Sequence, residues 1–350
     1  MRILITGGCG FLGSNLAASF LAEEAEVVIV DALFRKGSVS NLHWLEEQDM
    51  GNQLHFIQAD VADSESVFSI FRRHAPFDYV CHVGGQVAMT SSLQDPLRDL
   101  QTNVVGTFNI LEAIRNLSAD SLLAYSSTNK VYGDLEWLHY EETDTRYFLP
   151  DYPQGLDEKL PLDFSTPYGC SKGSADQYVR DWARVYGLKT IVFRHSSIYG
   201  GRQFASFDQG WIGWFCQQAL AQRDAIRNGG APQPFTIAGT GKQVRDVLHA
   251  SDLVALYKQA YNLRERYDGE ILNIGGGVEN SLSLLELFTL LSRLLGIDRL
   301  HFQATPRRSS DQDYFVSNNT KATRLLDWQP KMSCEAGIQS MLTWSQNIMS

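Results

Sequence analysis

Two residues of the segment PYGCSK (167–172) have the types and the spacing of an alcohol–ketone redox centre. Tyr168 stands four positions before Lys172, so their side chains share one face if the segment is helical. A tyrosine that removes a hydroxyl proton needs a pKa near neutrality, about three pH units below its ordinary value. A lysine ammonium nearby lowers that pKa by Coulombic attraction. The spacing alone is weak evidence in a chain with 14 tyrosines, so its meaning depends on the surrounding residues.

A third candidate group lies at the end of a predicted strand. The apolar run SLLAYSS (121–127) is followed directly by Thr128. In a doubly wound sheet the carboxyl ends of the strands border the ligand crevice, so Thr128 can meet Tyr168 there and hydrogen-bond a reacting oxygen. We predict Tyr168 as the acid–base group, Lys172 as the residue that tunes it and Thr128 as their partner. The alternative is that Tyr168 packs in the core and Lys172 is solvated.

A glycine-rich turn offers a place for a dinucleotide. The segment ITGGCGFLG (5–13) follows the first strand and begins a helix, with Gly7, Gly10 and Gly13 spaced three apart. The first glycine permits a tight turn, the second lets the backbone approach a pyrophosphate, and the third allows close packing of helix on strand. The helix N-terminus adds free N–H groups and a partial positive charge.

Asp31, at the end of the second strand, favours NAD over NADP. It lies 18 residues beyond Gly13, where a carboxylate hydrogen-bonds the adenosine ribose hydroxyls and repels a 2′-phosphate. Arg35 and Lys36 follow closely and would soften that preference. We predict NAD as the cofactor.

Two later segments complete the predicted cofactor site. Asp60 and Val61, after the third strand, are placed to contact the adenine, although Asp60 can equally be the N-cap of a helix at SESV (64–67). The segment HVGGQ (82–86) has two glycines that let the backbone pass close to a cofactor. The predicted cofactor-binding residues named so far are Gly7, Gly10, Phe11, Leu12, Gly13, Asp31, Asp60, Val61, Val83, Gly84, Gly85, Gln86, Ser126, Tyr168 and Lys172.

The first half of the chain alternates short apolar runs with helical segments. The runs are rich in β-branched residues and nearly continuous in apolar character, which is typical of strands buried on both faces. A helix is predicted over 97–116, where Leu97, Leu100, Val104, Phe108, Leu111 and Ile114 recur at helical spacing. The alternation predicts a parallel sheet with right-handed crossovers. The predicted strands are RILIT (2–6), VVIVD (27–31), LHFIQAD (54–60), FDYVCHV (77–83), SLLAYSS (121–127) and KTIVFRH (189–195).

We therefore expect an α/β protein with a doubly wound parallel sheet of the Rossmann type and a smaller, mixed α/β C-terminal domain for the substrate. The NAD-binding domain is predicted over 1–196, with segments near 235–275 returning to it. The sugar-nucleotide-binding domain is predicted mainly over 197–350, with helices near 281–296 and 334–347.

Two segments interrupt the alternation of strands and helices. Residues 134–164 hold nine acidic and two basic residues and are predicted to form a surface loop beside the site, because loops of this length are often functional. The segment GGRQFASFDQGWIGWF (200–215) is dense in glycine and aromatic residues. It is predicted to shape a ligand site and to continue into a helix.

Charge and cysteine usage exclude several classes of function. The formal net charge is -10 at pH 7, which argues against binding to nucleic acids or acidic membranes, since both need a basic surface. No apolar run approaches the ~20 residues that cross a membrane, and the glycine-rich start argues against a signal peptide. The five cysteines have no metal or disulfide spacing, so we expect no metal site and a cytoplasmic protein. Cys9 and Cys170 are interpreted as small fillers rather than nucleophiles.

Three motifs together carry a resemblance to a known family. TGGCGFLG (6–13), SSTNKVYG (126–133) and YGCSK (168–172) resemble the extended short-chain dehydrogenase/reductases, which include nucleotide-sugar epimerases and dehydratases. The resemblance spans almost the whole chain. It implies that Tyr168 is the acid–base group, that Lys172 tunes it and that Thr128 assists.

A dehydratase of this family typically carries an Asp–Glu pair after the catalytic threonine. Asn129 and Lys130 stand there in this chain, which argues against dehydration. Longer blocks, above all FRHSSIYGGRQFASFDQGWIGWFCQ (193–217), are most similar to those family members that act at carbon 2 of CDP-linked 3,6-dideoxyhexoses. The resemblance therefore implies a CDP-linked hexose as substrate.

The resemblance also implies roles for individual residues. Asn103 and His195 would border the cofactor, and Arg245 and Arg308 would hold the sugar-nucleotide diphosphate. Independently, an acidic protein that binds a diphosphate needs local guanidinium groups, although either arginine can instead be structural. Trp211 or Trp214 would stack on a base or sugar, or pack in the core. The implied substrate-binding residues are Gln86, Thr128, Asn129, Ser197, Arg202, Gln203, Trp211, Arg245, Arg308 and Asp311.

The implied activity is epimerisation of CDP-paratose to CDP-tyvelose with NAD. These 3,6-dideoxy sugars differ at carbon 2 and have no oxygen on carbon 3, so the simple route is oxidation to a 2-keto sugar and hydride return to the opposite face. The alternatives are a CDP-glucose 2-epimerase, a UDP-hexose 4-epimerase and a non-catalytic NAD(H)-binding sensor. Helices near 97–116 and 168–186 commonly pair between subunits in this family, which implies a homodimer or homotetramer, although their apolar residues can equally be core.

Overall fold

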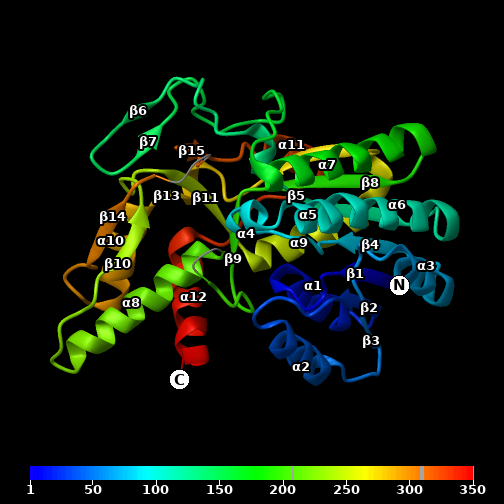
Figure 1. Cartoon of the computed structure of the whole chain (residues 1–350), viewed down its shortest axis with the longest axis horizontal. Coiled ribbons are helices and arrows are strands. Elements are labelled where there is room, and N and C mark those ends of the chain that lie inside the picture. The colour runs from blue at the N-terminus through cyan, green and yellow to red at the C-terminus, as the bar shows by residue number, and fades with distance from the viewer. Residues whose placement is uncertain (207–208, 308–310, 350) are drawn as a thin grey trace.

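The fold is built around a seven-stranded sheet in which all neighbouring strands run parallel (Figure 1). The computed structural model describes residues 1–206, 209–307 and 311–349. In spatial order the strands are β12 (Glu270–Ile274), β8 (Thr190–His195), β5 (Leu122–Thr128), β4 (Tyr79–His82), β1 (Arg2–Thr6), β2 (Glu26–Asp31) and β3 (Leu54–Gln58).

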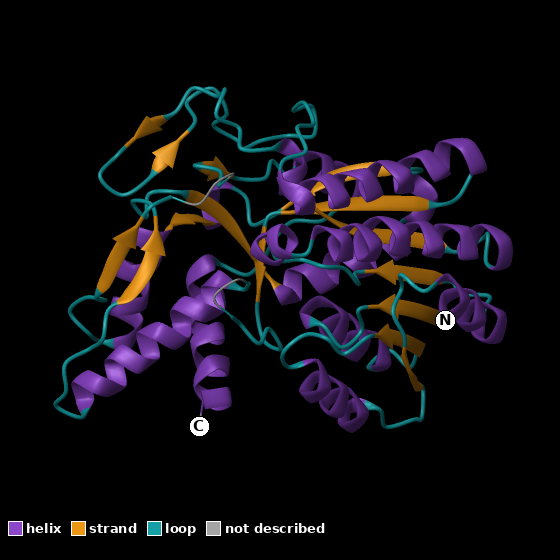
Figure 2. Ribbon diagram, in the orientation of Figure 1, coloured by secondary structure: helices purple, strands orange, loops and turns teal. Residues whose placement is uncertain are grey.

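Helices cover both faces of this sheet, as Figure 2 shows. Successive strand residues point to opposite faces, so Ile3 and Ile5 of β1 pack in one hydrophobic cluster and Leu4 packs in the other. The first cluster includes residues of α1 (Phe11–Leu21), α2 (Ser38–Gln48), α9 (Ala250–Asn262) and α11 (Thr320–Leu326). The second includes residues of α3 (Ser64–His74), α6 (Gly106–Leu117) and α7 (Thr166–Tyr186).

The helix predicted over 97–116 is in fact divided. It consists of α5 (Pro96–Leu100), a π-helical turn η1 (Gln101–Val105) and α6, while the short α4 (Met89–Gln94) precedes it. Only the end of the predicted apolar stripe is core: Leu111 and Ile114 are fully buried, whereas Leu97 is 61% exposed and Phe108 41% exposed. The π turn adds a residue to the repeat, so the two halves of the stripe do not share one buried face.

The smaller part of the molecule lies beside the carboxyl ends of the large sheet (Figure 1). Its central strand β11 (Val244–His249) pairs with β9 (Ser197–Tyr199), β13 (Ser281–Ser283) and β15 (Tyr314–Phe315), and β10 (Phe235–Ala238) pairs with β14 (Phe302–Thr305). Three helices supply most of its separate hydrophobic cluster: α8 (Trp211–Arg227), α10 (Leu284–Leu295) and α12 (Cys334–Met349). The 3-10 turns are η2 (Asn129–Tyr132), η3 (Arg264–Arg266) and η4 (Val278–Asn280).

The acidic segment 134–164 is more than the surface loop that the sequence predicts. It contains the two-stranded ribbon β6 (Glu141–Glu142) and β7 (Tyr147–Phe148). Five of its six leucines are buried in a cluster with Val244 and Phe315, whereas Leu162 is exposed. The buried leucines anchor the segment to the smaller sheet, while most of its acidic side chains face solvent; Glu158 instead accepts a hydrogen bond from the Asn273 amide.

The expected fold class is confirmed. Each predicted strand overlaps an observed one, with ends that differ by at most two residues. The seventh strand, β12, comes from the later segment near 235–275, and α9 packs with it, whereas β10 and β11 of that segment lie in the smaller part. In the described part of the chain no helix is long and apolar enough to cross a membrane.

His82, at the end of β4, is a buried and neutral group. Thr6 Oγ1 lies 2.6 Å from its Nδ1, and Thr107 Oγ1 lies 2.9 Å from its Nε2. Burial, and after it the charge of Lys172, lowers the pKa of His82 to about 3. The folded protein therefore excludes the imidazolium form at mildly acidic pH.

Acidification is expected to destabilise the fold through His82. Below the ordinary histidine pKa of about 6.5 the unfolded chain binds a proton that the folded chain does not, so the free energy of unfolding falls by about 1.4 kcal/mol per pH unit. In urea titrations between about pH 7.5 and 5, His82→Asn should reduce this slope, and the exposed His43→Asn should retain it. Parallel pH curves for the wild type and His82→Asn would show the prediction to be wrong.

Candidate active site

A cavity of about 550 Å³ runs from the glycine turn to Ser126 at the end of β5. The turn brings two strand ends unusually close, since a Cβ on Gly7 would lie 2.6 Å from Gly84 Cα. Gly7 also has φ +67°, a conformation that other residues rarely adopt. A Cβ on Gly13 would lie 2.0 Å from the Gly7 carbonyl oxygen, so the helix can pack there only on a glycine.

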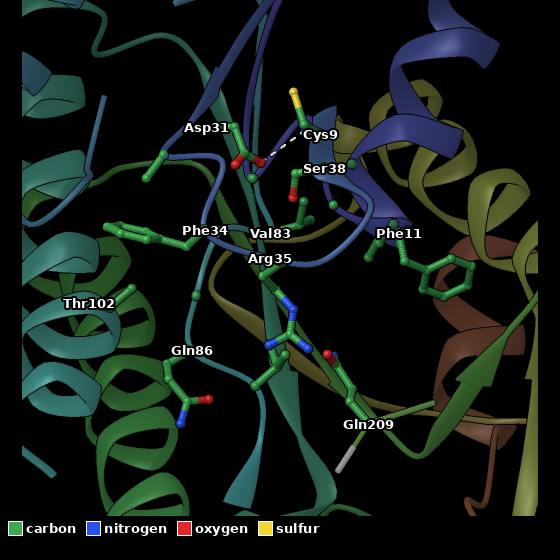
Figure 3. Close-up of a pocket in the computed structure, with 18 of the residues that line it drawn as sticks. Cys9, Phe11, Asp31, Phe34, Arg35, Ser38, Val83, Gln86, Thr102 and Gln209 are labelled. Carbon is green, nitrogen blue, oxygen red and sulfur yellow. Dashed lines mark hydrogen bonds between the residues drawn. The ribbon is translucent and has the colours of Figure 1, made fainter. Parts of the chain in front are cut away.

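Asp31 lies on the wall of this cavity at the end of β2 (Figure 3). Its Oδ2 accepts a hydrogen bond from the Cys9 amide at 3.0 Å, and its Oδ1 accepts one from the Leu33 amide at 2.8 Å. Burial raises the pKa of Asp31, and the backbone hydrogen bonds oppose that rise. The Cys9 thiol is fully buried and burial raises its pKa, as expected for a filler.

The loop between β2 and α2 forms a wall that sequence reasoning missed. Phe34, Arg35 and Lys36 line the cavity, and the Arg98 guanidinium lies 3.9 Å from the centre of the Phe34 ring. In Figure 3 the Arg35 side chain extends into the cavity toward Gln209. The basic pair after Asp31 is the signal that could have found this wall, but the sequence pattern indicated only an effect on cofactor preference.

The loop after β3 supplies Asp60 and Val61, which both line the cavity. Asp60 Oδ1 accepts a hydrogen bond from the Ala62 amide at 2.9 Å. The N-cap of α3 is Asp63, whose side chain accepts from the Glu65 amide. The alternative that Asp60 caps this helix is therefore wrong.

Tyr168 and Thr128 meet where α7 begins and β5 ends. The Thr128 hydroxyl lies close enough to the Tyr168 phenol to lower its pKa, and the Tyr168 amide donates to Ser92 Oγ at 3.2 Å. Burial raises the pKa of Tyr168 to about 12, whereas the Thr128 hydrogen bond and the charge of Arg35 work in the opposite direction. The pair has the geometry to hold an oxygen atom between a hydroxyl and a phenol.

Lys172 lies one helical turn further and is only 4% exposed. Its ammonium donates to the Ser126 carbonyl oxygen and lies 4.4 Å from the centre of the Tyr125 ring. Burial lowers the pKa of Lys172 to about 7, against the attraction of Asp99 and Asp176. Burial is the largest influence on the Tyr168 phenol and raises its pKa, so the lowering of that pKa by Lys172 stays a prediction.

A buried ion pair anchors the helix that carries both residues. Arg194 of β8 donates from Nε and Nη2 to the two carboxylate oxygens of Asp176, each at 2.8 Å. Ser127 Oγ also donates to Asp176 at 2.8 Å, and Tyr132 Oη lies 2.9 Å from Arg194 Nη1. Burial disfavours the charged form of Arg194, but its bonds to Asp176 outweigh burial and raise its pKa. Sequence reasoning missed this pair because nothing local links residues 18 positions apart.

Four predicted cofactor residues are not among those that line the cavity: Asn103, Tyr168, Lys172 and His195. The Asn103 side chain is 1% exposed and hydrogen-bonds the Gln86 backbone and Ser171 Oγ, so it fixes the β4 loop against α7. His195 ends β8 at the level of Thr128 and is 4% exposed. Its Nδ1 has no hydrogen-bond partner among the residues that the structure describes. Burial, followed by the charge of Lys172, lowers its pKa to about 3.

The predicted substrate residues fall into two groups. Arg202 and Gln203 line the same cavity as Asp31, and the Arg202 guanidinium lies 4.1 Å from the centre of the Trp44 ring of α2. Arg202 and Gln203 therefore lie in the part of the molecule predicted to bind the cofactor, next to the glycine turn. Ser197 accepts a hydrogen bond from Trp211 Nε1 at 3.1 Å.

The second group lies at the junction with the smaller part. Arg245 Nη2 donates to Asp311 Oδ1 at 2.8 Å. Asn129 donates to Gln312 Oε1 at 2.8 Å, and Gln312 donates to the Gly133 carbonyl oxygen at 2.7 Å. Gln312 was not predicted, since it follows no motif. The predicted Arg308 lies outside the described residues.

Comparisons with known proteins agree on the family. The sequence profile of the family described as GDP-mannose 4,6 dehydratase matches residues 4–341. The chain is 51% identical to the CDP-paratose 2-epimerase of Salmonella typhi, with 99% of this chain and 100% of that protein covered. This chain belongs to the extended short-chain dehydrogenase/reductase family of epimerases and dehydratases.

Solved structures of the family share the whole architecture. UDP-glucose 4-epimerase from Thermotoga maritima, determined with UDP-glucose, superposes with a TM-score of 0.81 at 28% identity, and all of both chains is covered. UDP-glucose 4-epimerase from Thermus thermophilus, determined with NAD, has a TM-score of 0.79 at 25% identity, with 99% of each chain covered. These two UDP-glucose 4-epimerases thus share the scaffold of this chain.

The buried pair behind the family's acid–base helix yields a stability prediction. Arg194→Met leaves the Asp176 carboxylate buried without its partner, and we expect a loss of about 3–5 kcal/mol of unfolding free energy, measured by urea titration. The matched control is Arg293→Met, which removes an arginine paired with Glu335 at the surface and should leave the unfolding midpoint close to that of the wild type. Equal effects of the two substitutions would contradict the anchoring role of Arg194.

Proposed function

We propose that this chain is an NAD-dependent isomerase that converts CDP-paratose to CDP-tyvelose by epimerisation at carbon 2. The observation that carries the proposal is the 51% identity over 99% of the chain to a CDP-paratose 2-epimerase. It is supported by the proximity of Thr128 and Tyr168 at the carboxyl end of the sheet. The five cysteines are all free, which supports a reducing, cytoplasmic location.

The residues around the large cavity fit a dinucleotide. Gly7, Gly10 and Gly84 line this cavity. A Cβ on Gly7 would collide with Gly84, and one on Gly84 with Gly7, so the glycines let the turn and the β4 loop pack together on the wall where backbone can approach a diphosphate. Asp31 stands at one end of the cavity, where we place the adenosine. His195 lies behind the opposite end, beside Thr128, and its Nδ1 has no partner among the described residues. We propose that these residues hold NAD and that Lys172 contacts its nicotinamide ribose.

NAD supplies the redox chemistry when it is bound: it accepts the hydrogen of carbon 2 as hydride and returns it to the opposite face. Tyr168 takes the proton of the carbon 2 hydroxyl and later gives it back. Thr128 hydrogen-bonds the same oxygen and orients it. Because burial raises the pKa of Tyr168 to about 12, the phenol needs nearby positive charge to act as a base, and the buried Lys172 keeps an ammonium close to it.

The substrate itself determines which carbon reacts. Carbon 3 of a 3,6-dideoxyhexose has no oxygen, so no ketone can form there to acidify the hydrogen on carbon 2. Direct oxidation of carbon 2 is the remaining simple route. The hexose must then reorient in the site while the nucleotide stays bound. The Arg245 guanidinium at the junction is suited to hold the diphosphate.

The exposed apolar face of α5, α6 and α7 supports a homodimer. Leu97 is 61% exposed, Phe108 is 41% exposed and Tyr186 is 47% exposed, and such a patch on a folded chain marks an interaction surface. Phe108 stacks edge-on against Tyr178 and Trp182 of α7, so the two helices present one continuous surface. We propose that this face joins two copies, alone or as part of a homotetramer.

Product analysis tests the proposed activity. The wild type is incubated with CDP-paratose, CDP-glucose and UDP-glucose, and the sugar nucleotides are separated by chromatography. We expect CDP-tyvelose from CDP-paratose. Tyr168→Phe should lower turnover by about 10²- to 10⁴-fold without weakening CDP binding, because the phenol touches only the reacting oxygen.

Tyr152→Phe serves as the matched control, since Tyr152 is a half-buried tyrosine of the acidic segment and its variant should retain wild-type turnover. Conversion of UDP-glucose alone would replace the proposal with a 4-epimerase. Substantial turnover by Tyr168→Phe would remove Tyr168 from the acid–base role.

A further inference from the structure

Lys130 lies at the reaction centre although no role has been assigned to it. Its backbone amide donates to Thr128 Oγ1 at 3.2 Å. Its carbonyl oxygen would lie 3.2 Å from a Cβ on Gly169, the residue after Tyr168. The main chain of Lys130 therefore contacts Thr128 and lies against the residue that follows Tyr168.

The side chain of Lys130 leads from there to the cationic cluster of the smaller part. Its Nζ lies 3.8 Å from Asp311 Oδ1, the same oxygen that Arg245 Nη2 contacts at 2.8 Å. The Lys130 side chain is 19% exposed, and burial, followed by the charge of Arg245, lowers its pKa to about 8. Burial makes a charged Lys130 unfavourable here, so we expect an interaction that stabilises its ammonium.

The cluster has more positive than negative charge. Among the described residues, three cations, Lys130, Arg245 and Arg307, form ion pairs with two carboxylates, those of Asp311 and Asp313. This local surplus occurs in a chain whose net charge is -10. An anion that enters the junction would complete the charge balance.

The chemistry of the proposed substrate says which anion lies next to the reacting carbon. Carbon 2 is bonded directly to carbon 1, which carries the diphosphate, whereas carbon 4 lies across the sugar ring. If Tyr168 and Thr128 hold the oxygen of carbon 2, the phosphate on carbon 1 must lie close to them. Lys130 is the cation of the cluster whose own backbone contacts Thr128.

We propose that Lys130 binds the phosphate attached to the sugar and thereby presents carbon 2, rather than carbon 4, to Tyr168. The inference rests on the proposed function and extends it to the residue that selects the carbon. Arg245 then serves the same diphosphate from the opposite side, and Asp311 holds both cations in place between turnovers.

The comparison of CDP with CMP tests this contact, since CMP lacks the phosphate that would be attached to the sugar. In calorimetric titrations of the NAD-loaded protein, Lys130→Gln should weaken CDP binding by about 10-fold or more and leave CMP binding unchanged. Lys130→Arg, which keeps the charge, should restore most of the CDP affinity. In turnover of CDP-paratose, Lys130→Gln should raise KM and lower kcat together, because the sugar is then held less well over Tyr168.

Lys321→Gln is the matched control, because Lys321 also pairs with a carboxylate, that of Glu270 at 2.7 Å, and its side chain is only 27% exposed. This substitution should change neither the affinity for CDP nor the affinity for CMP. Equal weakening of CDP and CMP by Lys130→Gln, or no weakening of either, would overturn the proposal. If the wild type binds CDP but does not convert CDP-paratose, the proposed function is wrong. The comparison of CDP with CMP would still decide whether Lys130 binds the phosphate that CMP lacks.

Discussion

The ion pair between Arg194 and Asp176 is the constraint on which the reaction centre depends. Tyr168, Lys172 and Asp176 follow one another at intervals of four residues, so they form one polar stripe along α7 that faces the sheet. The third member is locked by two hydrogen bonds from β8 and one from β5. Because a buried charge without its partner costs several kcal/mol, α7 cannot slide or rotate without breaking this pair. The positions of the phenol and the ammonium relative to Thr128 follow from it.

This arrangement separates the chemistry from the choice of carbon. The acid–base pair lies entirely on the large sheet and α7, and relatives named as 4-epimerases share the scaffold at 28% identity. In the function that we propose, what differs is the place of the diphosphate, which would be held at the junction with the smaller part, where Arg245 and Asp311 meet. A net-acidic chain that gathers cations at this junction has the electrostatic means to fix one end of the substrate. The same end then decides which hydroxyl reaches Tyr168.

Local patterns in the sequence predicted the sheet, the glycine turn and the acid–base residues, since each depends on residues close together in the chain. The contacts that lie far apart in sequence were not predictable in this way. Arg194 and Asp176 meet across β8 and α7, and Lys130 meets Asp311 from the other end of the chain. The divided helix over 97–116 was missed because a π turn leaves the apolar spacing almost intact while it rotates the buried face. The leucines of the acidic segment were missed because charged neighbours masked their spacing.

Isotope retention at carbon 2 tests the central claim most directly. CDP-paratose that carries deuterium on carbon 2 would be converted in ordinary water, and the product would be examined by mass spectrometry and NMR. Oxidation and reduction at that carbon, with the hydrogen held in the closed site between the two steps, predicts CDP-tyvelose that keeps its deuterium on carbon 2. Loss of the label to solvent would mean that the hydrogen leaves carbon 2 as a proton. That result would contradict hydride transfer at carbon 2 and, with it, the role of Tyr168 and Thr128 as a redox centre.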